Sequence, residues 1–182
     1  MKKILFIVGS RRKDSFNRQL AKLTEKLIQD QAEVSYLDYS SIPLMDQDIE
    51  YPAPEEIERI RKQCLSADAI WIFTPEYNHS YPGALKNLID WLSRPLYKGA
   101  ARSENALNGK PFTISTAAGA SGGSFVREKL IELLNLLNAK EATTTYTGIT
   151  LDREAFTTGV LKADTENLKV QITELLDALV NN

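Results

Sequence analysis

The stretch AIWIFTPEYNHSYPGALKNLIDW, which runs from Ala69 to Trp91, decides the fold class. It begins with a short apolar run, residues 69–73, that is typical of a buried strand. Residues 74–82 are polar and proline-containing, and they predict a loop. Beyond the loop, apolar side chains recur at helical spacing and predict a helix that packs back on the sheet: Leu85, Leu88, Ile89 and Leu92. The loop should therefore lie at the carboxyl end of a strand, where open α/β sheets bind their ligands.

The composition of this loop favours a planar ring with hydrogen-bonding edges over a bare phosphate or a metal. Glu76 and Asn78 supply polar side chains, and backbone N–H groups are free to donate except at the prolines. Tyr77 and Tyr81 supply flat apolar faces. In the alternative interpretation, the two tyrosines only plug the end of the sheet and Pro75 only shapes a turn.

Length and composition limit the possible classes of protein. A chain of 182 residues, 43% of them hydrophobic, fits one domain over residues 1–182 with a sizeable core. The formal net charge of −2 gives no indication of nucleic acid or of an anionic membrane as a partner. No apolar run approaches the ~20 residues needed to span a bilayer. The run Ile4 to Val8 is too short for a signal peptide, so we interpret it as a first strand.

The single cysteine and the single histidine give no sign of a metal site or a catalytic nucleophile. One cysteine excludes a disulfide framework and favours a cytoplasmic setting. Cys64 continues the apolar series of Ile57 and Ile60 on a predicted helix, so we expect it to be a small buried hydrophobe. His79 has no cluster of metal-ligating residues around it in the sequence, and we expect no metal.

Strand and helix patterns alternate five times along the chain. We expect strands at residues 3–8, 33–37, 69–73, 112–116 and 142–146. We expect helices at about 15–29, 55–66, after residue 82, up to about residue 137, and at 165–179. Such alternation predicts an α/β fold, a three-layer flavodoxin-like arrangement with a five-stranded parallel sheet in the order 2-1-3-4-5 and helices on both faces. Residues 38–54 and 94–110 form long connections, of the kind that is often functional or covers a partner surface.

The loop GSRRKDSFN, residues 9–17, leads from the first strand into the first helix and predicts a phosphate site. A helix N-terminus attracts anions through its free N–H groups and its dipole. Arg12 offers charge-assisted hydrogen bonds, and neutral donors come from Ser10, Ser15 and Asn17. Asp14 opposes this interpretation unless it points to solvent. Alternatively, Asp14 or Ser15 is only an N-cap and the basic residues form a solvated turn.

The common motifs for larger nucleotides are missing from the sequence. It has no G-x-x-x-x-G-K-[ST], which argues against a P-loop NTPase, and no G-x-G-x-x-G after the first strand, which argues against a dinucleotide-binding Rossmann domain. The phosphate loop is therefore better suited to a mononucleotide or another monophosphate.

A loop of small residues, AAGASGG at 117–123, follows the fourth predicted strand and lets the backbone approach a ligand closely. The same residues match the nucleophile-elbow pattern G-x-S-x-G as Gly119, Ser121 and Gly123. That fold requires the order Ser, acid, His, whereas His79 precedes Ser121. The sequence therefore argues against an esterase.

Taken together, GSRRKDSFN, TPEYNHSYPGALKNLIDW and AAGASGG resemble the NAD(P)H-dependent FMN reductases, a family that includes quinone, azo-dye and chromate reductases. The resemblance implies a flavodoxin-like fold that binds FMN without a covalent link. By this resemblance, the FMN phosphate would be held by Ser10, Arg12, Ser15, Phe16 and Asn17. The isoalloxazine ring would be bordered by Pro75, Glu76, Tyr77 and Asn78. Its pyrimidine side and the ribityl chain would lie along Ser115, Ala117, Ala118, Gly119, Ser121 and Gly122.

The resemblance also implies the reaction. A hydride would pass from NADPH or NADH to flavin N5, and two electrons would then pass to a small-molecule acceptor such as a quinone, a free flavin or an azo compound. No side chain would act as a catalytic residue. Family members form homodimers or homotetramers with FMN near the interface. The competing hypotheses are a flavodoxin-type electron carrier, which the near-neutral charge does not favour, and a non-catalytic flavin-binding protein.

Overall fold

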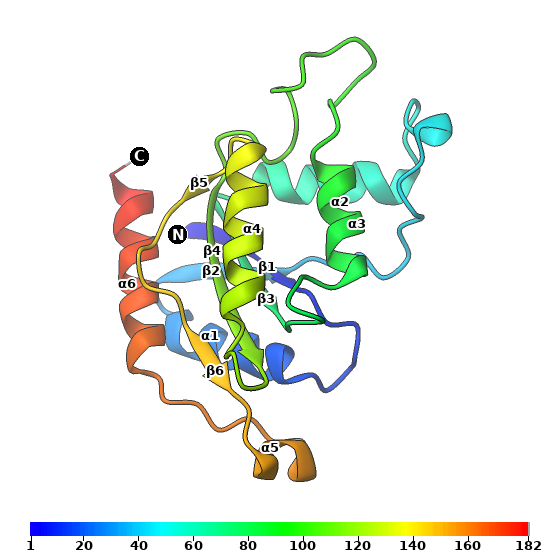
Figure 1. Ribbon diagram of the computed structural model, residues 1–182. Coiled ribbons are helices and arrows are strands. Elements are labelled where there is room, and N and C mark those ends of the chain that lie inside the picture. The colour runs from blue at the N-terminus through cyan, green and yellow to red at the C-terminus, as the bar shows by residue number, and fades with distance from the viewer. Residues whose placement is uncertain (182) are drawn as a thin grey trace.

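A parallel β-sheet with the strand order β2-β1-β3-β4-β5 forms the centre of the structure (Figure 1). The computed structural model describes residues 1–181. The four longer strands are β1 (Lys2–Val8), β2 (Ala32–Tyr36), β3 (Ala69–Thr74) and β4 (Pro111–Ala118). Two short strands, β5 (Lys140–Glu141) and β6 (Gly148–Thr150), both pair in parallel with β4. The predicted strand order is therefore confirmed, and β4 extends two residues further into the third loop than predicted.

The prediction of a fifth strand at residues 142–146 is wrong in its position. These residues connect β5 to β6. The Ala142 N–H still bonds to the Phe112 carbonyl of β4 at 2.9 Å, but the polar groups of Thr144 and Thr145 bond to helix α6 (Glu166–Val180) instead of continuing the ladder. The backbone N–H groups of Thr144 and Thr145 both donate to the Glu174 carboxylate at 2.8 Å. Thr143 instead shares a hydrogen bond of 2.6 Å with Thr113. The side-chain partners on α6 and β4 thus override the local preference of three threonines for a strand.

Five helices cover the two faces of the sheet. Helices α1 (Phe16–Ile28) and α6 pack on one face, whereas α2 (Glu55–Ser66), α3 (Gly83–Leu92) and α4 (Ser124–Leu136) pack on the other. The central strands alternate between the two cores: Ile70 and Ile72 face α2 and α3, and Trp71 and Phe73 face α1 and α6. Both faces are buried, which explains the continuous apolar runs in the sequence. No helix among residues 1–181 is both long enough and apolar enough to cross a membrane.

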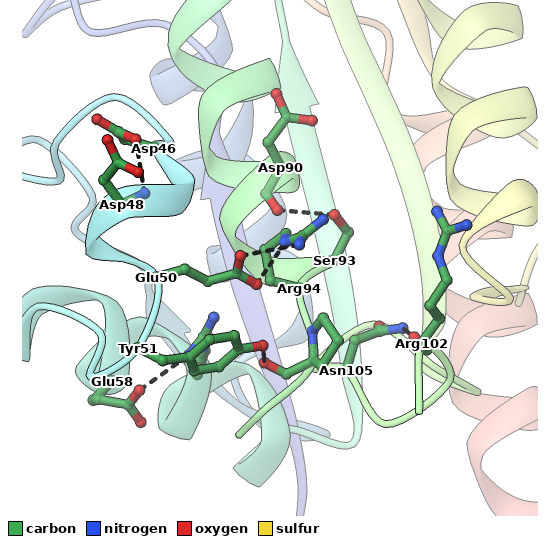
Figure 2. A network of polar contacts seen from close by, with 12 residues as sticks. Asp46, Asp48, Glu50, Tyr51, Glu58, Asp90, Ser93, Arg94, Arg102 and Asn105 are labelled. Carbon is green, nitrogen blue, oxygen red and sulfur yellow. Dashed lines mark hydrogen bonds and ion pairs between the residues drawn. The ribbon is translucent and has the colours of Figure 1, made fainter. Parts of the chain in front are cut away.

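The two long connections brace each other at one side of the sheet. Residues 38–54 contain a short helix, η1 (Gln47–Ile49), that the sequence pattern does not reveal. Figure 2 shows Glu50 pointing at Arg94, with an ion pair of 2.7 Å, and the Tyr51 hydroxyl donating to the Pro95 carbonyl at 2.7 Å. Trp91 Nε1 also donates to the Pro43 carbonyl at 2.9 Å. These contacts fix both connections on the α3 side of the fold.

Candidate functional site

A cavity of about 340 Å³ lies where the loops after β1, β3 and β4 meet, at the carboxyl ends of the strands. This is the edge of the sheet at which the strand order predicts a ligand. The cavity is lined by the predicted residues Ser10, Arg12, Ser15, Phe16, Asn17, Pro75, Glu76, Tyr77, Ala117, Ala118 and Gly119. It is also lined by Leu151, Phe156 and Gly159, which the sequence did not indicate as site residues. Four predicted site residues do not line it: Asn78, Ser115, Ser121 and Gly122.

The start of helix α1 forms one end of the cavity. Ser15 is the N-cap, and its hydroxyl oxygen accepts the Arg18 N–H at 3.1 Å. The backbone N–H groups of the first helical residues have no carbonyl within the helix to bond. The hydroxyl hydrogens of Ser10 and Ser15 are also available to donate, since the described contacts of both hydroxyls use the oxygen as acceptor. The interpretation of Ser15 as a cap is confirmed and is compatible with anion binding at the same end.

Arg12 and Phe16 pack against each other beside the start of α1 and form one wall of the cavity. The Arg12 guanidinium lies over the Phe16 ring, 5.1 Å from its centroid. Arg12 is exposed, and its side chain remains free to move toward an anion. The approach of this loop to β3 requires Gly9, because a Cβ there would lie 2.6 Å from Thr74 Oγ1. The loop of residues 9–17 is therefore held tightly against the end of the neighbouring strand.

Asn17 fixes the phosphate loop to the end of β4. Its amide nitrogen donates to the Ala117 carbonyl and its amide oxygen accepts the Ala117 N–H, both at 2.9 Å. Asn17 is 2% exposed. Although Asn17 lines the cavity, these two bonds already use its oxygen and one of its N–H groups, so its clearest role is to position the two loops.

Glu76 joins the loop after β3 to the start of helix α4. One carboxylate oxygen accepts the Ser121 hydroxyl at 2.8 Å, and the other accepts the Val126 N–H at 3.0 Å. A carboxylate at a helix N-terminus is favourable for the helix dipole. Ser121 thus acts as a bridge next to the cavity, and its hydroxyl donates to a carboxylate instead of to an imidazole. This arrangement gives no support to the nucleophile-elbow alternative.

The segment Tyr77–Ser80 is a tight turn at the mouth of the cavity. The N–H of each end residue donates to the carbonyl of the other, at 2.9 and 3.0 Å. Asn78 and His79 both have positive φ angles, 52° and 57°, which is the geometry of a type I′ turn. The His79 ring stacks on Phe125 with 4.1 Å between centroids. Asn78 is thus a turn residue, and the half-exposed Tyr77 is the aromatic side chain of this loop that lines the cavity.

Ser115 lies inside the sheet, facing α6. Its hydroxyl accepts Trp71 Nε1–H at 3.0 Å and donates to Gln171 Oε1 at 3.0 Å. Gln171 on α6 is fully buried and also accepts the Thr147 N–H at 3.0 Å. This buried network connects β3, β4 and α6. Nothing in the sequence pattern singles out Gln171, because it lies among the apolar residues of an ordinary amphipathic helix.

The missed lining residues belong to a short helix, α5 (Arg153–Thr158), and its flanks. Asp152 caps its start by accepting the Ala155 N–H at 2.7 Å, and Gly159 ends it with a φ of 71°. An Asp followed several residues later by Gly is a recognisable pair of helix start and stop signals. That pair predicts the helix but not its position at the cavity.

The chemistry of the cavity fits a ligand with an anionic phosphate at one end and a flat ring at the other. Hydroxyl and N–H donors and Arg12 lie at the α1 end, where the Phe156 ring contacts Phe16. Tyr77 and Leu151 supply apolar walls elsewhere in the cavity. A Cβ added at Gly119, which lines the cavity, would meet no atom within 4 Å, so no protein atom covers this part of the backbone. The volume lies within the range of small-molecule sites, about 300–1,000 Å³.

The described residues outside the cavity, within 1–181, contain neither a reactive thiol nor a metal-binding cluster. Cys64 is buried, its thiol donates to the Ala106 carbonyl at 3.2 Å, and burial raises its pKa to about 12. Among residues 1–181, no group of three or more His, Cys, Asp or Glu side chains is placed to hold a metal. A larger cavity of about 480 Å³ lies away from the ligand edge, between the C-terminal ends of α3 and α4. We assign the function to the smaller cavity, because the loops of three strands converge on it.

Comparisons with known proteins agree with this geometry. The sequence model of the family described as NADPH-dependent FMN reductase matches residues 2–151. The chain is 39% identical over 129 residues to the 2-hydroxy-1,4-benzoquinone reductase of Burkholderia sp., a match that covers 70% of this chain and 67% of that protein. It is 38% identical over 140 residues to a quinone reductase of Escherichia coli K12, covering 75% of this chain and 71% of that protein.

A solved structure matches over the whole chain. FerB, a flavoenzyme NAD(P)H:(acceptor) oxidoreductase from Paracoccus denitrificans, superimposes with a TM-score of 0.81 at 30% sequence identity, covering 100% of this chain and 96% of that one. The family match ends at residue 151, so helices α5 and α6 lie beyond it.

Proposed function

Because the chain belongs to the NADPH-dependent FMN reductase family, we propose that it passes electrons from NADPH or NADH through bound FMN to a quinone. It is an oxidoreductase of this family, with FMN as its cofactor. The observation that carries the proposed site is the convergence of the three strand-end loops on one cavity, which has hydrogen-bond donors at its α1 end and apolar walls elsewhere. A quinone is a small planar acceptor, which suits the apolar end.

In this proposal, the residues of the cavity bind and orient FMN. Ser10, Ser15 and the first N–H groups of α1 hold the phosphate, and Arg12 adds a charge-assisted hydrogen bond. Tyr77 and the backbone of residues 117–119 border the ring. When bound, FMN supplies the redox chemistry by accepting a hydride from the reduced nicotinamide and giving two electrons to the acceptor.

The protein itself contributes rigidity and hydrogen-bond donors, without a catalytic side chain. Glu76 ties the ring-bordering loop to α4, and Asn17 ties the phosphate loop to β4, so the two halves of the site keep a fixed separation. Preorganised N–H donors stabilise negative charge that develops during a reaction. Tyr77 is 53% exposed, which leaves the mouth of the cavity open to acceptors of different sizes.

We also propose a homodimer or a homotetramer with FMN near the interface, in the cytoplasm. Tyr77 and Phe125 are both exposed beside the mouth of the cavity, and exposed aromatic side chains of this kind favour a protein interface. The one cysteine of the chain is a free thiol, in keeping with a reducing compartment. Light scattering after gel filtration measures the assembly, and a monomer would contradict this part of the proposal.

The visible spectrum of the purified protein tests the main proposal. The protein is incubated with FMN, freed of unbound flavin and titrated anaerobically with NADPH and, separately, with NADH. We expect the flavin absorption to bleach with at least one of them and to return when benzoquinone is added. A flavin that stays oxidised with both would indicate an electron carrier. A protein that retains no flavin would contradict the FMN site.

A further inference from the structure

We propose that residues 152–161 form an arm that retains FMN, with Phe156 closing the phosphate end of the cavity and Gln19 holding the arm in place. The inference rests on the proposed FMN site and adds a set of binding residues to it. The arm comprises α5 and its flanks and lies beyond the residues matched by the family model.

The position of the arm places it at the cavity. Figure 1 shows α5 below β6, outside the layers of helices that cover the sheet. Leu151, Phe156 and Gly159 nevertheless line the cavity, together with the loops after β1, β3 and β4. The arm therefore forms a fourth side of a site whose other three sides come from strand-end loops.

Phe156 has no role in the core that would explain an aromatic side chain at this position. It is 63% exposed, and the only buried residue of α5 is Ala155. Its ring meets the Phe16 ring edge-to-face, with 5.9 Å between centroids and an angle of 90°. Phe16 is the first residue of α1, where the phosphate is expected, so Phe156 extends the wall made by Arg12 and Phe16 over that end. A bound ligand would cover part of the exposed ring.

Gln19 attaches the arm to the same helix that offers the phosphate site. Its amide nitrogen donates to the Gly159 carbonyl at 2.7 Å, and its amide oxygen accepts the Leu161 N–H at 2.9 Å. Gln19 lies on the first turns of α1, where its own N–H donates to the Ser15 carbonyl at 3.0 Å. The two bonds from Gln19 fix the end of the arm relative to Ser15 and thus relative to the phosphate.

Only a few contacts attach the arm to the rest of the protein. Two hydrogen bonds, one aromatic contact and the packing of Ala155 and the partly buried Leu161 on the core hold the arm, so it can open without disturbing the sheet. Opening exposes the phosphate end, and closing covers it. We therefore expect the arm to act chiefly on the dissociation rate of FMN, as contacts at the rim of a preformed site generally do.

Dissociation of FMN from the holoprotein tests the inference without measuring catalysis. Release is followed by flavin fluorescence after mixing with an excess of an apoflavodoxin that traps free FMN. We expect Phe156→Ala to speed release about tenfold, as for the loss of one aromatic contact, and Gln19→Ala to speed it several-fold. Phe156→Tyr keeps the ring and is expected to restore the wild-type rate.

Two matched variants control for general effects of truncation. Val160→Ala shortens an exposed apolar side chain of the same arm that does not line the cavity. Gln31→Ala removes a glutamine whose described bond is to a carbonyl just before it in the chain, Leu27. Both should release FMN at the wild-type rate. Melting temperatures of the FMN-free proteins should be equal for all variants, because the arm contributes little to the core.

The outcomes separate this inference from the proposed function. A wild-type protein that binds no FMN would overturn both. A wild-type protein that binds FMN, with Phe156→Ala and Gln19→Ala releasing it at the wild-type rate, would overturn the arm and leave the FMN site intact. If Phe156→Ala fails to fold, Gln19→Ala decides, and faster release from that variant alone supports the arm.

Discussion

Asn17 and Ala117, which lie 100 residues apart in the chain, are joined by two hydrogen bonds of 2.9 Å between one side-chain amide and one peptide backbone. Both residues are almost fully buried, at 2% and 1% exposure, so water cannot replace either bond. The pair holds the first turn of α1 against the end of β4. The spacing of the two loops that border the proposed FMN site therefore depends on a contact between protein groups alone.

Asn17→Ala is expected to destabilise the FMN-free protein. The change leaves a buried N–H and a buried C=O of Ala117 without partners, which costs about 2–3 kcal/mol in the free energy of unfolding. Urea denaturation measures this loss. Asn135→Ala serves as the control, because its amide bonds an exposed Glu141 carboxylate and its loss should cost little. Equal stabilities of the two variants would contradict the structural role of Asn17.

Gly119→Val is expected to weaken FMN binding at least tenfold without affecting the fold. A Cβ at this position meets no atom within 4 Å, and Gly119 lines the cavity, so the added methyl groups occupy ligand space. The control is Gly83→Val, where a Cβ also meets nothing but the residue lies outside the cavity. Titration with FMN gives the dissociation constant and thermal denaturation gives the stability. Wild-type affinity in Gly119→Val would place the ligand elsewhere.

The sheet order could be predicted from the sequence because β1 and β3 are buried on both faces and appear as continuous apolar runs. The fifth strand could not be placed in the same way. Residues 142–146 have the local preference of a strand, but the Glu174 carboxylate takes the N–H groups of Thr144 and Thr145. Glu174 lies about thirty residues away, and a local pattern carries no information about such a partner.

Contacts between residues far apart in the chain also limited what could be predicted about the site. The sequence predicts that the loops after β1 and β3 lie together, because strand ends share one edge of the sheet, and residues of both loops do line one cavity. Ser115 was assigned to the cavity by the resemblance alone, whereas its place on β4 turns its hydroxyl toward Gln171. Phe156 was missed because its place at the cavity depends on the bonds from Gln19 to the arm, a tertiary contact across about 140 residues.

The ion pair between Glu50 and Arg94 predicts a loss of stability in acid. Arg94 Nε and Nη2 lie 2.7 and 3.0 Å from the two oxygens of the Glu50 carboxylate (Figure 2), and this contact holds the pKa of Glu50 below its ordinary value of 4.5. A carboxyl group with a depressed pKa in the folded state adds stability above its unfolded pKa. That stability is lost as the pH falls through the depressed, folded-state pKa.

Arg94→Met should therefore lower the free energy of unfolding at neutral pH, and the difference from the wild type should shrink as the pH falls below 4.5. Urea denaturation at a series of pH values measures this difference. Lys162→Met is the control, because it removes an exposed ion pair with Glu154 that should contribute little at any pH. A difference for Arg94→Met that stays constant with pH would show that Arg94 stabilises the fold by packing alone.

Arg61 is a buried guanidinium with incomplete hydrogen bonding. Its replacement is predicted to raise the free energy of unfolding, whereas replacement of Arg94 is predicted to lower it. It is 1% exposed, and its Nη1 lies 3.0 Å from the Glu58 carboxylate. Its Nε and Nη2 are buried without a partner in the part of the chain that the structure describes. Burial of a charge that is only partly hydrogen-bonded costs free energy, and a well-packed apolar residue of similar length often stabilises a protein at such a position.

We expect Arg61→Met to raise the free energy of unfolding by about 1 kcal/mol, because the aliphatic stem is kept while the poorly bonded charge is removed. Arg61→Ala should lower it, because a truncated side chain leaves a cavity between α2 and its neighbours. Urea denaturation of the two variants beside the wild type measures both effects. If Arg61→Met is destabilised as much as Arg61→Ala, then the guanidinium itself, and not the stem, stabilises this part of the fold.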